Sequence, residues 1–115
     1  MDFVNLTLHP MTTEVSGGPA FEIQSPIFDV SGYKTLHTVL AVQAVQGAGA
    51  VVNCTLEDSM DGNIWRPMGT LSLGVVGPPV VLVSTTFGRF LRVTFNYGVA
   101  GTAVTFSLLA IAREF

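Results

Sequence analysis

The chain consists of short runs of aliphatic, β-branched and aromatic residues, separated by glycine, proline, asparagine and aspartate. The clearest run is residues 89–97, in which every second residue from position 91 is apolar: Leu91, Val93, Phe95 and Tyr97. Successive side chains of a strand point to opposite faces of a sheet, so this run predicts a strand with one buried face. No run carries a convincing 3.6-residue period of an amphipathic helix. The sequence therefore predicts an all-β fold.

Further runs of this kind, with the turns between them, predict about eight strands. The runs are residues 3–9, 20–24, 35–45, 50–58, 64–66, 69–76, 79–84, 89–97 and 102–113. Short turns between short strands favour a two-sheet antiparallel sandwich, jelly-roll-like, with an up-and-down barrel as the alternative.

The length of 115 residues suits one domain with its own core and is too short for two ordinary domains. Residues 1–19 are expected to form an N-terminal strand or arm and a flexible connection, because Pro10 should end the first run and residues 16–19 read Ser-Gly-Gly-Pro. Residues 20–115 are expected to form the β-sandwich domain.

Charge is scarce in this chain. Only 11% of the residues are charged, against about 25% in typical domains, while 49% are hydrophobic. A small domain normally coats its large exposed surface with charged side chains, so we expect other protein chains to cover part of this surface. The net charge is -3 and the five basic residues are scattered, which argues against nucleic-acid binding.

High hydropathy raises the question of a membrane, and the sequence argues against one. Residues 93–112 carry no charge and are long enough to span a bilayer, but they contain Asn96, Gly98 and Gly101, which fit two strands and a turn better. Residues 67–88 contain two adjacent prolines and four glycines. No basic segment followed by an apolar one marks the N-terminus as a signal peptide. We therefore expect the hydrophobic residues at the surface to contact other protein chains.

Few residues could carry out catalysis. His9 and His37 are the only histidines and so the only candidates for the base of a hydrolase triad, but neither lies near a glycine-rich nucleophile turn. Both are expected to be surface or hydrogen-bonded structural residues. The single cysteine, Cys54, excludes an intrachain disulfide and is expected to be buried in a strand, with a reactive thiol or a metal ligand as the alternatives.

The densest acidic cluster is Glu57, Asp58 and Asp61. All three lie on one turn, whereas glycosidase carboxylates face each other across a cleft, so a solvated hairpin loop is expected. A calcium loop is a weaker alternative, because Met68 occupies the position where an EF-hand has its closing acid. Phosphate-binding loops and zinc motifs are absent from the sequence. We therefore expect no enzyme activity, no cofactor and no metal site.

Two segments resemble a pattern of small β-sandwich proteins. Residues 57–65 read Glu-Asp-Ser-Met-Asp-Gly-Asn-Ile-Trp, and residues 89–93 read Arg-Phe-Leu-Arg-Val. Together they are similar to a motif of virion accessory proteins of tailed bacteriophages, such as capsid decoration or cement proteins and other head or tail components. The motif also resembles that of discoidin-like carbohydrate-binding modules. The resemblance covers roughly residues 28–112.

The resemblance to decoration proteins implies a homo-oligomer, expected to be a trimer, that binds the major capsid protein. It would lie on the capsid exterior of a virion assembled in the host cytoplasm, with an N-terminal arm extended to the shell. The candidate interface consists of apolar residues of the N-terminal arm and of strands that are expected to be apolar on both faces. These residues are Phe3, Val4, Leu6, Leu8, Val39, Val45, Leu109 and Ile111.

Two alternatives follow from the same resemblance. One is a carbohydrate-binding or receptor-recognition module of a phage tail or adhesin, with Trp65 as the stacking platform for a sugar. The other is a head-tail connector or tail component. A purely structural interpretation of the first segment is also open: Asp61-Gly62 forms the turn, Ser59 hydrogen-bonds its backbone, and Trp65 plugs the end of the sandwich.

Overall fold

The computed structural model describes residues 3–17 and 22–114, which form nine strands and no helix. The strands are β1 (Phe3–Val15), β2 (Glu22–Gln24), β3 (Phe28–Asp29), β4 (Thr35–Gln46), β5 (Val52–Ser59), β6 (Arg66–Leu73), β7 (Val80–Ser84), β8 (Phe90–Tyr97) and β9 (Ala103–Arg113). No helix with the length and hydropathy of a membrane span occurs in these residues.

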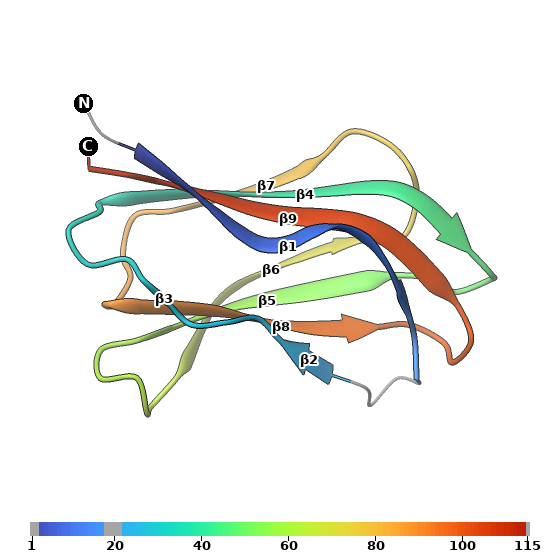
Figure 1. Ribbon diagram of the computed structural model, residues 1–115, viewed down its shortest axis with the longest axis horizontal. Helices are drawn as coiled ribbons and strands as arrows, with labels where there is room; N and C mark the ends of the chain where they lie inside the picture. Colours follow the sequence, from blue (N-terminus) through green and yellow to red (C-terminus); the bar gives the residue numbers. More distant parts are fainter. Residues whose placement is uncertain (1–2, 18–21, 115) are drawn as a thin grey trace.

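The strands form two antiparallel sheets that face each other (Figure 1). One has the order β1-β9-β4-β7, and the other has the order β2-β8-β5-β6 with β3 also paired to β8. Because β2 and β3 pair with successive parts of β8, they are two halves of one interrupted strand. Counted in this way, eight strands form two sheets of four, and most connections cross from one sheet to the other, as in a jelly roll. The predicted antiparallel sandwich is confirmed.

Proline causes the interruption between β2 and β3. Pro26 has no N–H to donate to β8. The preceding Ser25 restores the hydrogen bonding, since its N–H donates to the Val93 carbonyl oxygen at 2.8 Å and its Oγ accepts from the Val93 N–H at 2.9 Å. The central strand β8 therefore keeps its backbone partners across the break.

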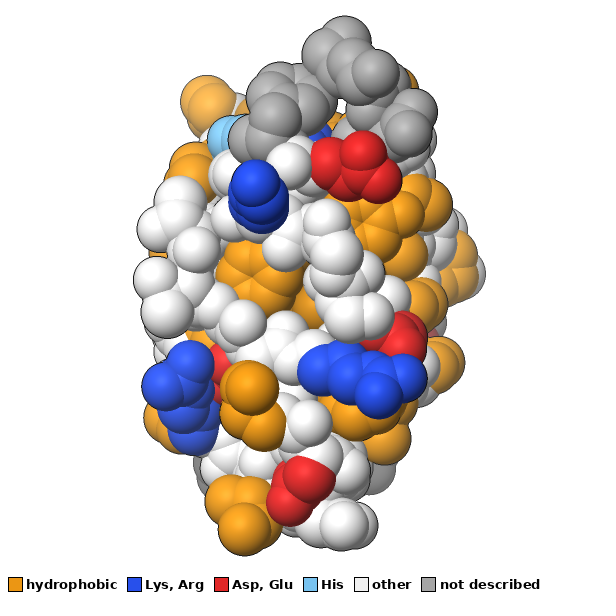
Figure 2. Space-filling model, turned by 90° about the vertical axis from the view of Figure 1, so that its left-hand side faces the viewer, with side chains coloured by type: hydrophobic (Ala, Val, Ile, Leu, Met, Phe, Trp, Pro, Cys, Tyr) orange, Lys and Arg blue, Asp and Glu red, His pale blue; other side chains and the backbone are white. Residues whose placement is uncertain are grey.

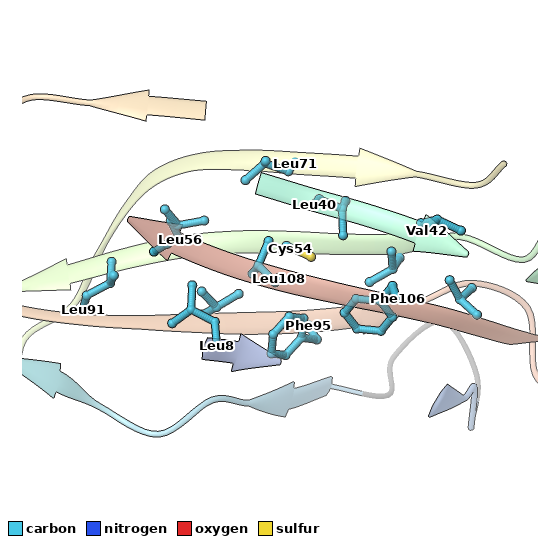
Figure 3. Close-up of a cluster of buried hydrophobic side chains, with 14 of the residues drawn as sticks. Leu8, Leu40, Val42, Cys54, Leu56, Leu71, Leu91, Phe95, Phe106 and Leu108 are labelled. Carbon is cyan, nitrogen blue, oxygen red and sulfur yellow. The ribbon is translucent and has the colours of Figure 1, made fainter. Parts of the chain in front are cut away.

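The core lies between the sheets and is made of alternate residues from both. Figure 3 shows leucine and phenylalanine side chains of the two sheets directed toward one another. The alternation predicted for residues 89–97 is confirmed, because Leu91, Val93, Phe95 and Tyr97 are all buried. Cys54 is also buried, as expected, and burial raises the pKa of its thiol to about 12. A thiol with a raised pKa stays protonated, so Cys54 packs as a core side chain.

The first strand differs from expectation, because Pro10 does not end it. β1 continues to Val15 and pairs with β9 along this length, with register shifts on either side of His9. β1 is an edge strand, where a proline removes no necessary hydrogen bond, so the strand accommodates Pro10 by bulging. The expected domain boundary between residues 19 and 20 lies outside the described residues.

A second difference concerns the strand that follows the acidic turn. Residues 64–66 and 69–76 were expected as two strands, but one strand, β6, spans Arg66–Leu73. A register shift between Leu56 and Glu57 of β5 accommodates an additional residue of β6. Ile64 and Trp65 consequently precede the strand.

Candidate functional site

The outer face of the β1-β9-β4-β7 sheet carries a continuous group of aliphatic side chains. The register places Val39 of β4 between Leu109 of β9 and Val81 of β7. Val81 and Val83 are 55% and 54% exposed, and the residues of β4 and β9 are half-buried between their neighbours. We call this group the apolar face; it consists of Val39, Val81, Val83, Leu109 and Ile111.

His37 lies within the apolar face, since it stands opposite Ile111 of β9 and Val83 of β7. Its Nδ1 is inaccessible to solvent and has no hydrogen-bond partner among the described residues. The nearest charged position in the register is Arg113, which pairs with Thr35 at the end of β4. The centre of this face therefore holds aliphatic side chains and one imidazole, with charge only at its end.

The outer face of the other sheet is polar. Asn53 of β5 lies between Asn96 of β8 and Ser72 of β6, and Thr55 lies between Thr94 and Thr70. Ser72 Oγ donates to Asn53 Oδ1 at 2.6 Å, so part of this surface satisfies its own hydrogen bonds. We call it the polar face; its members are Asn53, Thr55, Thr70, Ser72, Thr94 and Asn96.

Trp65 lies at one end of the polar face. The Arg92 guanidinium carbon is 4.2 Å from the centre of the indole ring, and Arg92 Nε donates to Glu57 Oε1 at 3.1 Å. Thr94 Oγ1 donates to the same oxygen at 2.6 Å. Trp65 is half-buried against the outward-facing Arg92, so it does not plug the end of the sandwich. A cation–π contact fixes the ring instead.

The acidic turn is held by its own hydrogen bonds. Ser59 Oγ accepts from the Gly62 N–H at 2.9 Å, as expected, and donates to Asp61 Oδ1 at 3.0 Å. The same Asp61 oxygen accepts from the N–H groups of Asn63 and Ile64. These backbone donors lower the pKa of Asp61.

The other two acids of the cluster point in different directions. The buried Asp58 accepts from Arg66 through both carboxylate oxygens, at 2.8 and 2.9 Å, and from the Gly88 N–H at 2.6 Å. The hydrogen bond from Arg66, together with that from Gly88, lowers the pKa of Asp58. Glu57 faces outward to Arg92. No group of three potential metal ligands occurs in the described part of the chain.

Both histidines are built into the sheet. The His9 ring stacks on Phe106 with centres 3.9 Å apart, and its Nε2 lies 3.2 Å from Glu14 Oε1. His9 Nδ1 lies 3.2 Å from the Phe106 carbonyl oxygen. His9 is therefore a packed, hydrogen-bonded residue. His37 belongs to β4, which is separated from β1 by β9, and it lies on the apolar face.

The candidate interface residues fall into separate places. Val39, Leu109 and Ile111 come together on the apolar face, whereas Leu8 is buried and Val4 and Leu6 pack against the core. These three residues of β1 therefore face inward, because β1 is a strand of the sandwich. Phe3 is 59% exposed at the start of β1, and Val45 is 38% exposed at the far end of β4.

Sequence reasoning missed Val81 and Val83 as members of the apolar face. The signal was present, because residues 79–84 were expected as a strand and read Pro-Val-Val-Leu-Val-Ser. The pairing of β7 with β4, which brings these valines beside Val39, is a long-range contact that the local pattern does not contain.

The scarcity of charge is also visible on the surface. Figure 2 shows one end of the molecule, where a few blue and red side chains lie among orange and white ones. Arg89–Asp29 and Arg92–Glu57, each at 3.1 Å, are ion pairs between neighbouring strands or turns of the described residues.

Comparison with known proteins supports the fold. No protein-family model matches the sequence, and no curated protein matches it significantly. Among solved structures, the PBSX exported protein XepA superposes with a TM-score of 0.67 at 12% identity over 96% of this chain. The Yersinia pseudotuberculosis-derived mitogen superposes with a TM-score of 0.51 at 16% identity, over 96% of this chain and 83% of the mitogen. The chain spans 37% of the length of XepA.

Proposed function

We infer that this chain is a structural protein of a phage virion, specifically a capsid decoration or cement protein that works by association and performs no chemistry. The observation that carries this inference is the apolar face: five aliphatic side chains on one outer sheet surface with no acidic residue among them. Burial of apolar area, at about 25 cal/mol per Å², is the driving force that such an association would use. The motif in residues 57–65 and 89–93 supports the same class.

The partners that follow from this proposal are further copies of the chain and the major capsid protein. The resemblance favours a trimer on the capsid exterior. The XepA structure, to which this fold is similar, is that of a PBSX exported protein. Charge depletion fits this role, because a surface that contacts other protein chains loses the charged residues that keep a free domain soluble.

Light scattering on the purified chain tests the association. We expect a mass of several chains for the natural sequence and a smaller mass for Val39→Lys, because a lysine in the centre of the apolar face would bury an unpaired charge. Thr55→Lys is the matched control, since Thr55 occupies the equivalent central position on the polar face. A stable monomer of the natural sequence at high concentration would contradict the proposal.

A carbohydrate-binding or receptor-recognition role is the second candidate, and the polar face favours it. This face presents hydroxyl and amide side chains beside an aromatic ring, which are the groups that bind sugars. Binding on a glycan array that is lost in Trp65→Ala and kept in Val39→Lys would support this role. No binding by the natural sequence would count against it.

A head-tail connector or tail component would present similar surfaces. Cryo-electron microscopy of the native particle distinguishes these positions. Density for this fold on the outer shell supports decoration, and density at the portal vertex or along the tail supports the alternative.

A further inference from the structure

Four strand edges border the two sheets of this sandwich. They belong to β1 and β7 in one sheet and to β6 and the interrupted β2–β3 strand in the other. An edge strand presents unpaired N–H and C=O groups, and proteins normally block such edges with proline, charge, bulges or interruptions. The four edges of this chain differ in how they are blocked.

Three of the edges carry such obstacles. β1 contains Pro10 within the second of its two register shifts, and β6 contains Pro67 beside Arg66. The β2–β3 edge is broken at Pro26 and carries the acidic residues Glu22 and Asp29. None of these edges offers a regular, uncharged row of backbone groups to another strand.

β7 has none of these obstacles. It reads Val-Val-Leu-Val-Ser, with no proline, no charge and no register shift against β4. Among the described residues β4 is its strand partner in the sheet, so its other side is an edge. The adjacent Pro78 and Pro79 lie outside the strand. An edge without proline, charge or bulge leaves its N–H and C=O groups free to pair with another strand.

The surface beside the second half of this edge, from Leu82 onward, is hollowed. A groove of about 380 Å³ runs there, lined by Arg66, Pro67 and Met68 on one side and by residues 82–86 on the other. Leu82 points inward and packs against Gly69, where an added Cβ would lie 2.8 Å from a Leu82 methyl carbon. This packing anchors β7 to the sandwich while its edge stays accessible.

We propose that β7 pairs antiparallel with β7 of a second copy, around a two-fold axis at Leu82. This pairing joins the two β1-β9-β4-β7 sheets into one continuous sheet of eight strands. The inference deepens the proposed self-association and rests on it. If the chain forms trimers through another surface, the two-fold β7 contact links these trimers to one another. Without such trimers, the β7 contact gives dimers.

A second copy is the occupant because β7 is complementary to itself. In the register centred on Leu82, Val81 of each copy lies beside Val83 of the other, so the exposed valines of both copies cover each other. No like charges meet across the contact, since the strand has none. The two apolar faces also become contiguous across the axis, because Val81 and Val83 belong to both the edge and the face.

Charge substitution at these valines tests the contact. Val81→Lys/Val83→Lys places lysines opposite lysines of the second copy, and Val81→Glu/Val83→Glu places glutamates opposite glutamates. We expect each variant alone to associate about ten-fold more weakly or worse, and an equimolar mixture to recover the natural mass, because opposite charges then pair across the strands. Val75→Lys/Val76→Lys is the matched control, since these valines are equally exposed but lie in the loop before β7.

The outcomes separate this inference from the proposed function. Recovery in the mixture, with an even number of copies in the natural assembly, supports the β7 contact. Natural mass in both charged variants, while Val39→Lys has a smaller mass, overturns the β7 contact and leaves the proposed function standing. Failure of the mixture to recover also overturns it. A monomeric natural chain overturns both.

Hydrogen exchange on the natural sequence gives a second measurement that needs no folded variant. We expect amides of residues 80–84 to exchange faster on dilution, because dissociation frees the edge of β7. Protection that does not depend on concentration would overturn the inference.

Discussion

The two outer faces of this sandwich share the same architecture and differ in chemistry. On the apolar face, Val39 stands between Leu109 and Val81, whereas on the polar face Thr55 stands between Thr94 and Thr70. Each position is the centre of a three-strand row on the outside of a sheet. Ser72 donates a hydrogen bond to Asn53 at 2.6 Å on the polar face, while the aliphatic side chains of the apolar face adjoin one another and leave part of their surface exposed.

This difference shows which of the two outer sheet surfaces carries exposed aliphatic side chains. A fold with one sheet face exposed to water normally has polar residues there, as the β2-β8-β5-β6 sheet does. The β1-β9-β4-β7 sheet departs from this rule over its central rows. Most hydrophobic residues form the core, and other exposed ones, such as Met60, Ile64 and Val75, lie in loops. The apolar face is the sheet surface on which aliphatic side chains of three strands adjoin, so it is the place to test association.

The largest expected effect is a loss of association when aliphatic residues of the apolar face are replaced by threonine, as on the polar face. Val39→Thr, Leu109→Thr and Ile111→Thr together keep β-branched or strand-compatible side chains at outward positions, so the fold should be retained. We expect the mass in light scattering to fall below that of the natural assembly. Circular dichroism checks the fold. A natural mass in the triple variant would show that association uses another surface.

The second expected effect compares the inner and outer sides of β5 at neighbouring residues. Asp58 is buried and accepts hydrogen bonds from Arg66 and Gly88. Asp58→Asn should therefore lower the free energy of unfolding at pH 7 by about 1–2 kcal/mol. Arg66 is mostly exposed, so water weakens the contribution of the ion pair to this free energy. Urea unfolding measures this loss. Glu57→Gln, on the outer side, is the control and should cost less.

The same carboxylate sets a pH dependence. The folded-state pKa of Asp58 is lowered, so its contribution is present above its unfolded pKa of about 3.9 and is lost as the pH falls through the lower folded value. The difference in stability between the natural chain and Asp58→Asn should therefore shrink as the pH falls below 4. A difference that stays constant with pH would contradict the assignment.

A smaller effect is expected for Arg92→Ala at the end of the polar face. The variant loses a half-buried ion pair with Glu57 and the cation–π contact with Trp65, which together should contribute about 1 kcal/mol. Trp65 is the single tryptophan, so its fluorescence should shift to longer wavelength as water reaches the ring. Arg89→Ala is the control, because Arg89 pairs with the exposed Asp29 and stacks on Phe90.

The smallest expected effect is the coupling between Asn53 and Ser72. Their hydrogen bond is exposed, so a double-mutant cycle with alanine at both positions should give about 0.5 kcal/mol or less. A larger coupling would show that the polar face is a rigid network that resists opening.

The sequence predicted those features that depend on local alternation. The buried face of residues 89–97 was predicted correctly because each inward residue of this strand meets the same core. The path of β1 beyond Pro10 was not predictable locally, since it depends on β1 lying at an edge beside β9. The place of Trp65 depends on Arg92, which only the pairing of β5 with β8 brings near. For the candidate site, Val39, Leu109 and Ile111 were found by their strand faces, and Val81 and Val83 required the pairing of β7 with β4.

Because Cys54 is buried between the two sheets, the reaction of its thiol with a reagent reports the opening of the sandwich. A thiol with no exposed surface and a pKa raised to about 12 reacts with a soluble alkylating reagent only after the two sheets separate. Its labelling rate therefore measures the population of the open state under native conditions. Because no other cysteine competes for the reagent, the same experiment works on intact assemblies, where association should slow the labelling of every copy.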